Sequence, residues 1–383
     1  MVKEDYKKIG LVFLVAFSLR VGISSIPPLL PMLKKELAIS DVAASLLTSI
    51  PVICMGIFAL TVSFVQEKLG RRKGILVFLL VLSAAILARA VTVNYFGLIT
   101  TAFMVGVGTA IIGPLLSGYI KAEFPTRSGL LIGIYSISMG LGASISSGSV
   151  MKLTDYFGGR WNFALAFFGC LSLVGFFSWK TGTKQQSQSE LIVRKAALPL
   201  RNRQAWKITL FFGIQSGIFY GLTTWITTIA FSRGVSIEVA SLVLTFYTLI
   251  QMVFSFLIPL LMDYVGQVKS WSLICSSLVL IGIVGLLMRG AFLWFVLATF
   301  VIGVGLGGLF PIALLLPLKL THSAEETSAW TGMVQSFGYI IGGMIPILMG
   351  IIADIIPATN ASLWFVMLLS LIIIGITLRF NKI

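Results

Sequence analysis

Arg20 is the residue whose chemistry stands out first, because it lies near the middle of an apolar stretch that runs from residue 9 to residue 33. A charged side chain at the centre of a bilayer costs roughly 2.5–3.5 kcal/mol on insertion scales, so such a side chain normally faces a cavity or a partner. The sequence offers no evident partner, since the 13 acidic residues fall at the ends of apolar stretches, between them or in the tails. A guanidinium can hold a planar anion through two parallel hydrogen bonds. We therefore predict that Arg20 binds an anionic solute, with an internal salt bridge as the structural alternative.

Further polar and aromatic side chains inside apolar stretches could line the same site. Gln215, Tyr220 and Trp225 share the stretch 206–231, although Gln215 and Tyr220 lie about 140° apart on an ideal helix. The Gln215 amide could bind the solute or, equally, a neighbouring helix. Trp225 could wall a cavity or belong to an aromatic belt at the membrane interface. The predicted solute-binding residues are Arg20, Gln215, Tyr220, Trp225, Gln335, Tyr339, Tyr135 and Gln251.

Residues that carry covalent or metal chemistry are scarce. Cys54, Cys170 and Cys275 lie far apart inside apolar stretches, and His322 is the single histidine. Their spacing matches neither a metal site nor a redox pair, and the sequence has no Walker-type phosphate loop. The sequence therefore predicts no metal, no cofactor and no enzyme activity. The lack of a carboxylate at midplane depth also disfavours proton coupling through a membrane-embedded acid.

The elements that position these residues are predicted to be membrane helices. Of the 383 residues, 57% are apolar and only 11% are charged, and the mean hydropathy is +1.02. A soluble domain has about a quarter of its residues charged, and a spanning helix needs about 20 mostly apolar residues. Twelve such stretches are predicted, at 9–33, 42–66, 74–93, 96–120, 129–151, 161–179, 206–231, 238–262, 270–288, 292–317, 327–353 and 360–379.

The distribution of positive charge predicts the orientation. With both termini in the cytoplasm, 20 of the 28 Lys and Arg residues fall on the cytoplasmic side and 7 on the other, with Arg20 left over. This bias follows the positive-inside rule. We therefore expect a multi-pass protein of the cytoplasmic (inner) membrane of a prokaryote, and the net charge of +15 implies no nucleic-acid partner. Arg89 and Arg289 fall near the outer ends of their stretches, where we expect them to reach the interface.

The chain repeats itself. The sequence Gly-Val-Gly at 106–108 recurs at 303–305, an offset of 197, and Ser40 recurs as Ser236, an offset of 196. We therefore predict an all-α membrane protein with twelve transmembrane helices, in two six-helix halves related by a pseudo-two-fold repeat. A parallel repeat of this kind places the solute site near the midplane, between the halves. The predicted parts are an N-terminal half at 1–180, a cytoplasmic linker at 181–205 and a C-terminal half at 206–383.

The loop between the second and third stretches carries a known pattern. The segment SFVQEKLGRRK at 63–73 resembles the signature G-x-x-x-D-R-x-G-R-R of the major facilitator superfamily, from which Ser63, Glu67 and Lys68 depart. The resemblance implies that the acid pairs with helix ends and latches one conformation; alternatively, the basic residues only fix the topology. The residues predicted to act in the conformational change are Glu67, Gly70 and Arg71, with Asp263 and Gly266 as second-half counterparts.

Four further segments, at 19–31, 45–56, 212–225 and 335–339, resemble the cyanate transporter and 2-nitroimidazole exporter branch of this superfamily. The resemblance covers essentially the whole chain and implies a small, often anionic or polar solute. The leading hypothesis is a secondary carrier that moves a small anion by alternating access, working as a monomer in the lipid bilayer. The alternative is an exporter of small amphipathic or nitroheteroaromatic compounds. A receptor that keeps the fold without transporting is also left open.

Overall fold

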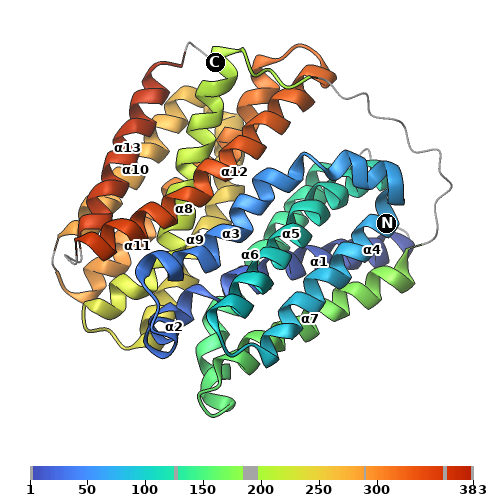
Figure 1. Ribbon diagram of the computed structural model, residues 1–383. Coiled ribbons are helices and arrows are strands. Elements are labelled where there is room, and N and C mark those ends of the chain that lie inside the picture. Colours follow the sequence, from blue (N-terminus) through green and yellow to red (C-terminus); the bar gives the residue numbers. More distant parts are fainter. Residues whose placement is uncertain (1–2, 125–127, 184–196, 289, 357–359, 381–383) are drawn as a thin grey trace.

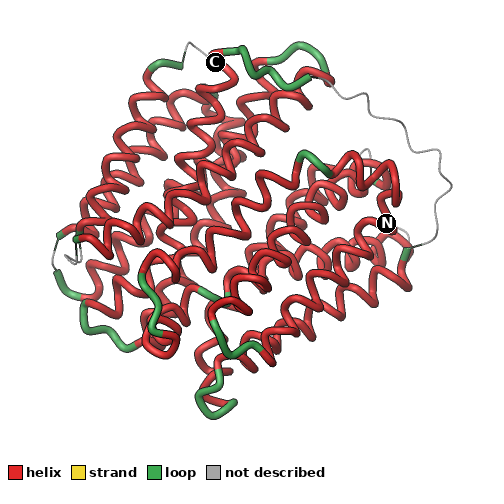
Figure 2. The backbone as a smooth tube through the Cα atoms, viewed as in Figure 1, coloured by secondary structure: helices red, strands yellow, loops and turns green. Residues whose placement is uncertain are grey.

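The computed structural model describes residues 3–124, 128–183, 197–288, 290–356 and 360–380. Within these ranges every regular element is a helix, which agrees with the predicted all-α fold (Figure 2). Eleven helical segments are long and apolar enough to cross a membrane. A twelfth long helix, Arg203–Ser232, carries Gln215, Ser216 and several threonines among its apolar residues.

The twelve long helices form two groups of six, and the first helix of the chain is broken. The first half contains α1 (Lys3–Ser24, continued by η1, Pro27–Leu29, and α2, Leu30–Leu37), α3 (Asp41–Ala59), α4 (Val62–Ala88, followed by η2, Arg89–Val91), α5 (Tyr95–Glu123), α6 (Ser128–Tyr156) and α7 (Trp161–Gly182). The second half contains α8 (Arg203–Ser232), α9 (Ile237–Val265), α10 (Val268–Leu287), α11 (Phe292–Leu320), α12 (Ala324–Ile355) and α13 (Ala361–Leu378). Most of the predicted linker, residues 184–196, lies outside the described residues.

One helix boundary differs from the prediction. The sequence predicted one helix over 42–66 and a loop from there to 73, but α3 ends at Ala59 and α4 begins at Val62 and continues through the signature segment. Polar and basic residues are compatible with a helix, so only Gly70 interrupts α4, with φ 70° and ψ 162°. Glycine reaches this conformation without a Cβ clash. Gly266, 196 residues later, has φ 61° and ψ 165°, so the repeat read from the sequence is present in the backbone.

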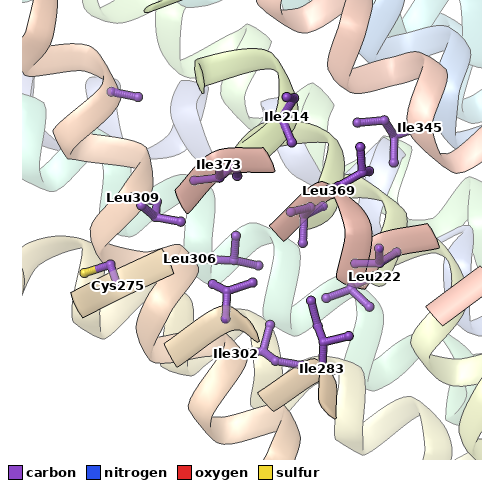
Figure 3. Close-up of a cluster of buried hydrophobic side chains, with 14 of the residues drawn as sticks. Ile214, Leu222, Cys275, Ile283, Ile302, Leu306, Leu309, Ile345, Leu369 and Ile373 are labelled. Carbon is purple, nitrogen blue, oxygen red and sulfur yellow. The ribbon is translucent and has the colours of Figure 1, made fainter. Parts of the chain in front are cut away.

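Each half has its own apolar core. In the first half the fully buried side chains include Leu19, Leu82 and Phe168. In the second half, Leu222 of α8 and Leu306 of α11 belong to a cluster that α10, α12 and α13 also join (Figure 3). Burial of such side chains inside each half leaves the contact between the halves free to use small and polar residues.

The halves meet mainly through α3 against α12 and α6 against α9. The chain enters and leaves the linker at one end of the bundle, the linker end, and we call the opposite end the distal end. The two bundles diverge toward the linker end, where α7 ends and α8 begins (Figure 1). At the distal end the helices approach closely: a Cβ on Gly350 of α12 would lie 2.8 Å from the Asp41 carbonyl oxygen of α3. Small residues therefore permit the contact between the halves.

The break in the first helix is bound by a buried arginine. Ile26 donates its backbone N–H to the Ile23 carbonyl, whereas Arg89 Nη1 donates to the Gly22 carbonyl at 2.7 Å. Arg89 Nε also donates to Thr101 Oγ1 at 3.3 Å, and its side chain is 1% exposed. The expectation that Arg89 reaches the membrane interface is therefore wrong. The broken helix exposes a carbonyl inside the protein, and that acceptor holds the guanidinium there.

Candidate functional site

Arg20 lies on α1, in contact with the opposite half of the molecule. Its neighbours Leu19 and Val21 are fully buried, whereas the Arg20 side chain itself is partly exposed. The Arg20 Cζ atom lies 5.7 Å from the centroid of the Tyr220 ring on α8. A cation over an aromatic face is attracted by the ring quadrupole. Arg20 therefore links α1 of the first half to α8 of the second.

Three tyrosines lie near the guanidinium. They are Tyr220, Tyr339 of α12 and Tyr135 of α6. The Tyr220 and Tyr339 rings lie 6.5 Å apart, and Tyr339 meets Phe212 edge to face at 5.1 Å. Four helices, two from each half, thus converge on one cation. The site is aromatic and positively charged.

No carboxylate balances this charge among the described residues. Two ion pairs of the described residues, Lys8 with Glu123 at 2.6 Å and Lys34 with Asp41, lie elsewhere and do not include Arg20. In the part of the chain that the structure describes, the neighbours of Arg20 are therefore tyrosines and not acids. A partly exposed guanidinium that faces only neutral groups can accept an anion as its counter-charge.

Other predicted solute-binding residues have different surroundings. Gln215 is buried, and its Nε2 donates to Ser216 Oγ at 2.7 Å. Trp225 is also buried, and its Nε1 donates to the Pro346 carbonyl at 3.1 Å, which joins α8 to α12. Gln335 lies one helical turn before Tyr339, and both Gln335 and Gln251 of α9 are partly exposed. The structure thus brings Arg20, Tyr220, Tyr339 and Tyr135 together, and it gives Gln215 and Trp225 hydrogen-bond partners within the protein.

Hydroxyl groups that were not predicted from the sequence join the halves on the distal side of the tyrosines. Thr224, one turn beyond Tyr220, shares a 2.9 Å hydrogen bond with Thr48 of α3. Between α6 and α9, Ser144 lies 3.1 Å from Thr248. The further contacts in this group are Ser147 with Thr245 at 3.3 Å and the Ser241 hydroxyl donating to the Ser147 carbonyl at 3.0 Å. Thr224 could have been found from its i+4 spacing to Tyr220.

Residues of the signature segment lie at the linker end. Glu67 is exposed, and a Cβ on Gly118 of α5 would lie 3.2 Å from Arg71 Nε. Arg72, which was not predicted, donates from Nε to Thr183 Oγ1 at 2.8 Å and from Nη2 to the Lys180 carbonyl at 3.1 Å. These bonds join α4 to the end of α7. Gly266 ends α9; Asp263 lies in the last turn of that helix, and its side chain is outside the described residues.

The family model of the major facilitator superfamily matches residues 12–343. The chain belongs to the major facilitator superfamily. This agrees with the arrangement of two six-helix halves, and it makes the chain a multi-pass membrane protein of a transporter family.

Three bacterial relatives have names that describe transporters. The uncharacterized transporter YycB of Bacillus subtilis is 29% identical over 90% of this chain and 86% of its own length. The 2-nitroimidazole transporter of Escherichia coli is 29% identical over 94% of this chain and 92% of its own. The cyanate transport protein CynX of the same organism is 28% identical over 89% of this chain and 88% of its own length. The predicted resemblance to this branch is confirmed.

Solved structures show the same fold. A bacterial homolog of the human lysosomal transporter Spinster, in an inward-facing and occupied conformation, superposes with a TM-score of 0.77 at 12% identity. The match covers 99% of this chain and 97% of that one. At this identity the likeness supports the fold of the superfamily and leaves the solute open.

Proposed function

We propose that this chain is a secondary carrier that moves a small anionic solute across the cytoplasmic membrane by alternating access, with Arg20 as the anchor for the solute. The observation that carries the proposal is a guanidinium between the halves that faces tyrosines and no acid among the described residues. A solute bound there contacts both halves. Its binding energy can therefore favour one arrangement of the halves over the other, as a carrier requires.

The surroundings of Arg20 favour a small solute with a planar or linear acceptor group. A guanidinium offers donors in a fixed fork, which suits two acceptor atoms in one plane, and the tyrosine rings offer flat apolar faces with hydroxyl groups at their edges. The two relatives with named solutes transport cyanate and 2-nitroimidazole by their names. Cyanate is an anion, and a nitro group has the planar pair of oxygens of a carboxylate. The aromatic ring contacts of Tyr220 and Tyr339 make an exporter of nitroheteroaromatic compounds the second candidate.

We further propose that the linker end faces the cytoplasm. Its described residues include Lys8, Arg72, Lys180 and Lys319, and cytoplasmic loops carry the excess of Lys and Arg. Because hydroxyl groups join the halves on the distal side of the tyrosines, the solute would reach Arg20 from the cytoplasm in this arrangement. A carrier of this kind works as a monomer, because each chain holds both halves of its site.

A ligand screen tests the proposed solute class. Purified protein in detergent is melted with cyanate, nitrate, acetate, 2-nitroimidazole, and a small organic cation such as tetramethylammonium as the comparison. A ligand at one hundred times its Kd stabilises the folded state by about 2.7 kcal/mol, so we expect at least one anion or the nitro compound to raise the melting temperature. Stabilisation by the cation alone, or by no probe, would contradict the proposal.

Substitutions of Tyr220 test the role of its ring. Tyr220→Phe keeps the face under Arg20 and Tyr220→Leu removes it, and a cation–π contact contributes about 0.5–2 kcal/mol. We expect Tyr220→Leu to weaken binding of the stabilising probe several-fold, roughly in line with that range, and Tyr220→Phe to retain most of it. Titration of the melting temperature against probe concentration measures both. Tyr264, an exposed tyrosine at the end of α9, provides the matched control as Tyr264→Leu.

A further inference from the structure

A carboxylate of one half binds the start of a helix of the other half at the distal end. Asp354, in the last turn of α12, accepts the Asp41 backbone N–H on Oδ1 at 2.8 Å and the Val42 backbone N–H on Oδ2 at 3.0 Å. Asp41 and Val42 are the first two residues of α3. The first N–H groups of a helix have no partner within it, and the helix dipole makes this end partly positive. Both oxygens of Asp354 are therefore engaged by the opposite half.

The neighbouring residues leave these N–H groups to Asp354. Ser40, the N-cap residue of α3, accepts the backbone N–H of Ala43 on Oγ at 3.2 Å. Its hydroxyl therefore does not occupy the N–H groups of Asp41 and Val42. The side chain of Asp41, which would repel Asp354, is paired with Lys34. Gly350, one turn before Asp354, lets α12 approach the Asp41 carbonyl closely. The contact thus depends on the present approach of α3 to α12 and has to break if the distal ends separate.

We propose that Asp354 is the latch that holds the distal end of the carrier closed over the Arg20 site. The inference rests on the proposed function, because a latch regulates access only in a protein whose halves move. Charge-assisted bonds to a helix start are stronger than the neutral hydroxyl contacts nearby. Thr48 with Thr224 and Ser144 with Thr248 join the halves through neutral groups, so removing the Asp354 carboxylate should favour the distal-open arrangement.

The experiment measures how often the distal end opens. Thr248→Cys puts a thiol on the buried distal contact between α9 and α6, where a membrane-impermeant maleimide applied from the distal side reaches it only after the halves separate. Reaction at residue 248 is followed by mass spectrometry, so the native Cys54, Cys170 and Cys275 do not interfere. In this background we compare the unmodified latch with Asp354→Ala and Asp354→Asn. The matched control is Glu238→Ala, which removes an exposed acid from the first turn of α9 at the same end.

We expect Asp354→Ala to raise the rate of labelling by roughly tenfold, which corresponds to the loss of about one charge-assisted hydrogen bond. Asp354→Asn should give a smaller increase, because an amide oxygen still accepts one N–H. Glu238→Ala should leave the rate unchanged. Equal labelling rates for Asp354→Ala and Glu238→Ala would overturn the proposal. The same holds if neither folded variant is labelled while the unfolded protein reacts.

A second readout separates this proposal from the proposed function. The stabilising probe of the ligand screen should still protect Asp354→Ala against melting, because the Arg20 site is intact. If labelling accelerates but no anion or nitro compound stabilises any variant, the latch stands and the proposed solute class fails. If a probe stabilises the protein but labelling does not respond to Asp354, the solute class stands and the latch fails.

Discussion

Arg20→Gln is expected to reduce solute uptake into proteoliposomes by at least tenfold, while the protein remains folded. A hydrogen bond to a charged group contributes about 1.5–3 kcal/mol, so losing one of them lowers affinity by roughly 10- to 150-fold. Arg20→Lys keeps the charge but not the fork of donors, so it should fall between Arg20→Gln and the unaltered protein. Uptake of radiolabelled cyanate, and of 2-nitroimidazole by its ultraviolet absorbance, measures the effect.

The matched control for Arg20 is Arg160, an exposed arginine that lies over the Phe163 ring with its Cζ 5.7 Å from the centroid. Both arginines thus have an aromatic neighbour, but only Arg20 lies between the halves. Arg160→Gln should transport at the rate of the unaltered protein. If Arg20→Gln melts normally and takes up both probes at that same rate, Arg20 is not the solute anchor.

Arg89→Ala is expected to cause the largest loss of stability. The substitution leaves the Gly22 carbonyl and the Thr101 hydroxyl without this donor and opens a cavity at a side chain that is 1% exposed. An unsatisfied buried polar group costs about 1–3 kcal/mol, and the cavity adds to it. We expect the melting temperature in detergent to fall by on the order of 5 °C. Arg89→Lys, which retains one donor group, should recover part of the loss.

The second half offers a comparison for Arg89. Arg233, at the end of α8, donates from Nη2 to the Leu286 carbonyl of α10, and its Cζ lies 5.1 Å from the Phe295 ring centroid. Because Arg233 is partly exposed, water can replace its bond to Leu286. Arg233→Ala should therefore lower the melting temperature less than Arg89→Ala. An Arg89→Ala protein as stable as the unaltered one would refute the structural role of the buried guanidinium.

Features set by local composition could be predicted from the sequence. Long apolar stretches predicted the helices, because a bilayer requires helices of that length. The recurrence of Ser40 as Ser236 predicted equivalent positions in the two halves. Both hydroxyls indeed cap the start of a helix, accepting the N–H of Ala43 and of Val239. The prominence of Arg20 followed from the cost of a charge at that depth. These inferences need only the residue and its distance along one helix.

Features that depend on how helices pack could not be predicted in the same way. The groups that Trp225 and Gln215 meet depend on helix rotation, and the sequence does not mark their hydrogen-bond partners, the Pro346 carbonyl and the Ser216 hydroxyl. The acceptor of Arg89 is a carbonyl released by the break of a different helix. Asp354 binds backbone groups 312 and 313 residues away, and no residue type marks a backbone N–H in the sequence.

Protection of Arg20 from an arginine-specific dicarbonyl reagent tests most directly whether Arg20 itself holds the solute. The purified protein is treated with phenylglyoxal with and without the probe that stabilises it best in the ligand screen. Mass spectrometry reads the modification at Arg20 and, in the same sample, at the exposed Arg160. We predict that a saturating probe slows modification of Arg20 at least tenfold and leaves Arg160 unaffected. Equal modification of Arg20 with and without the probe would show that Arg20 does not hold the solute.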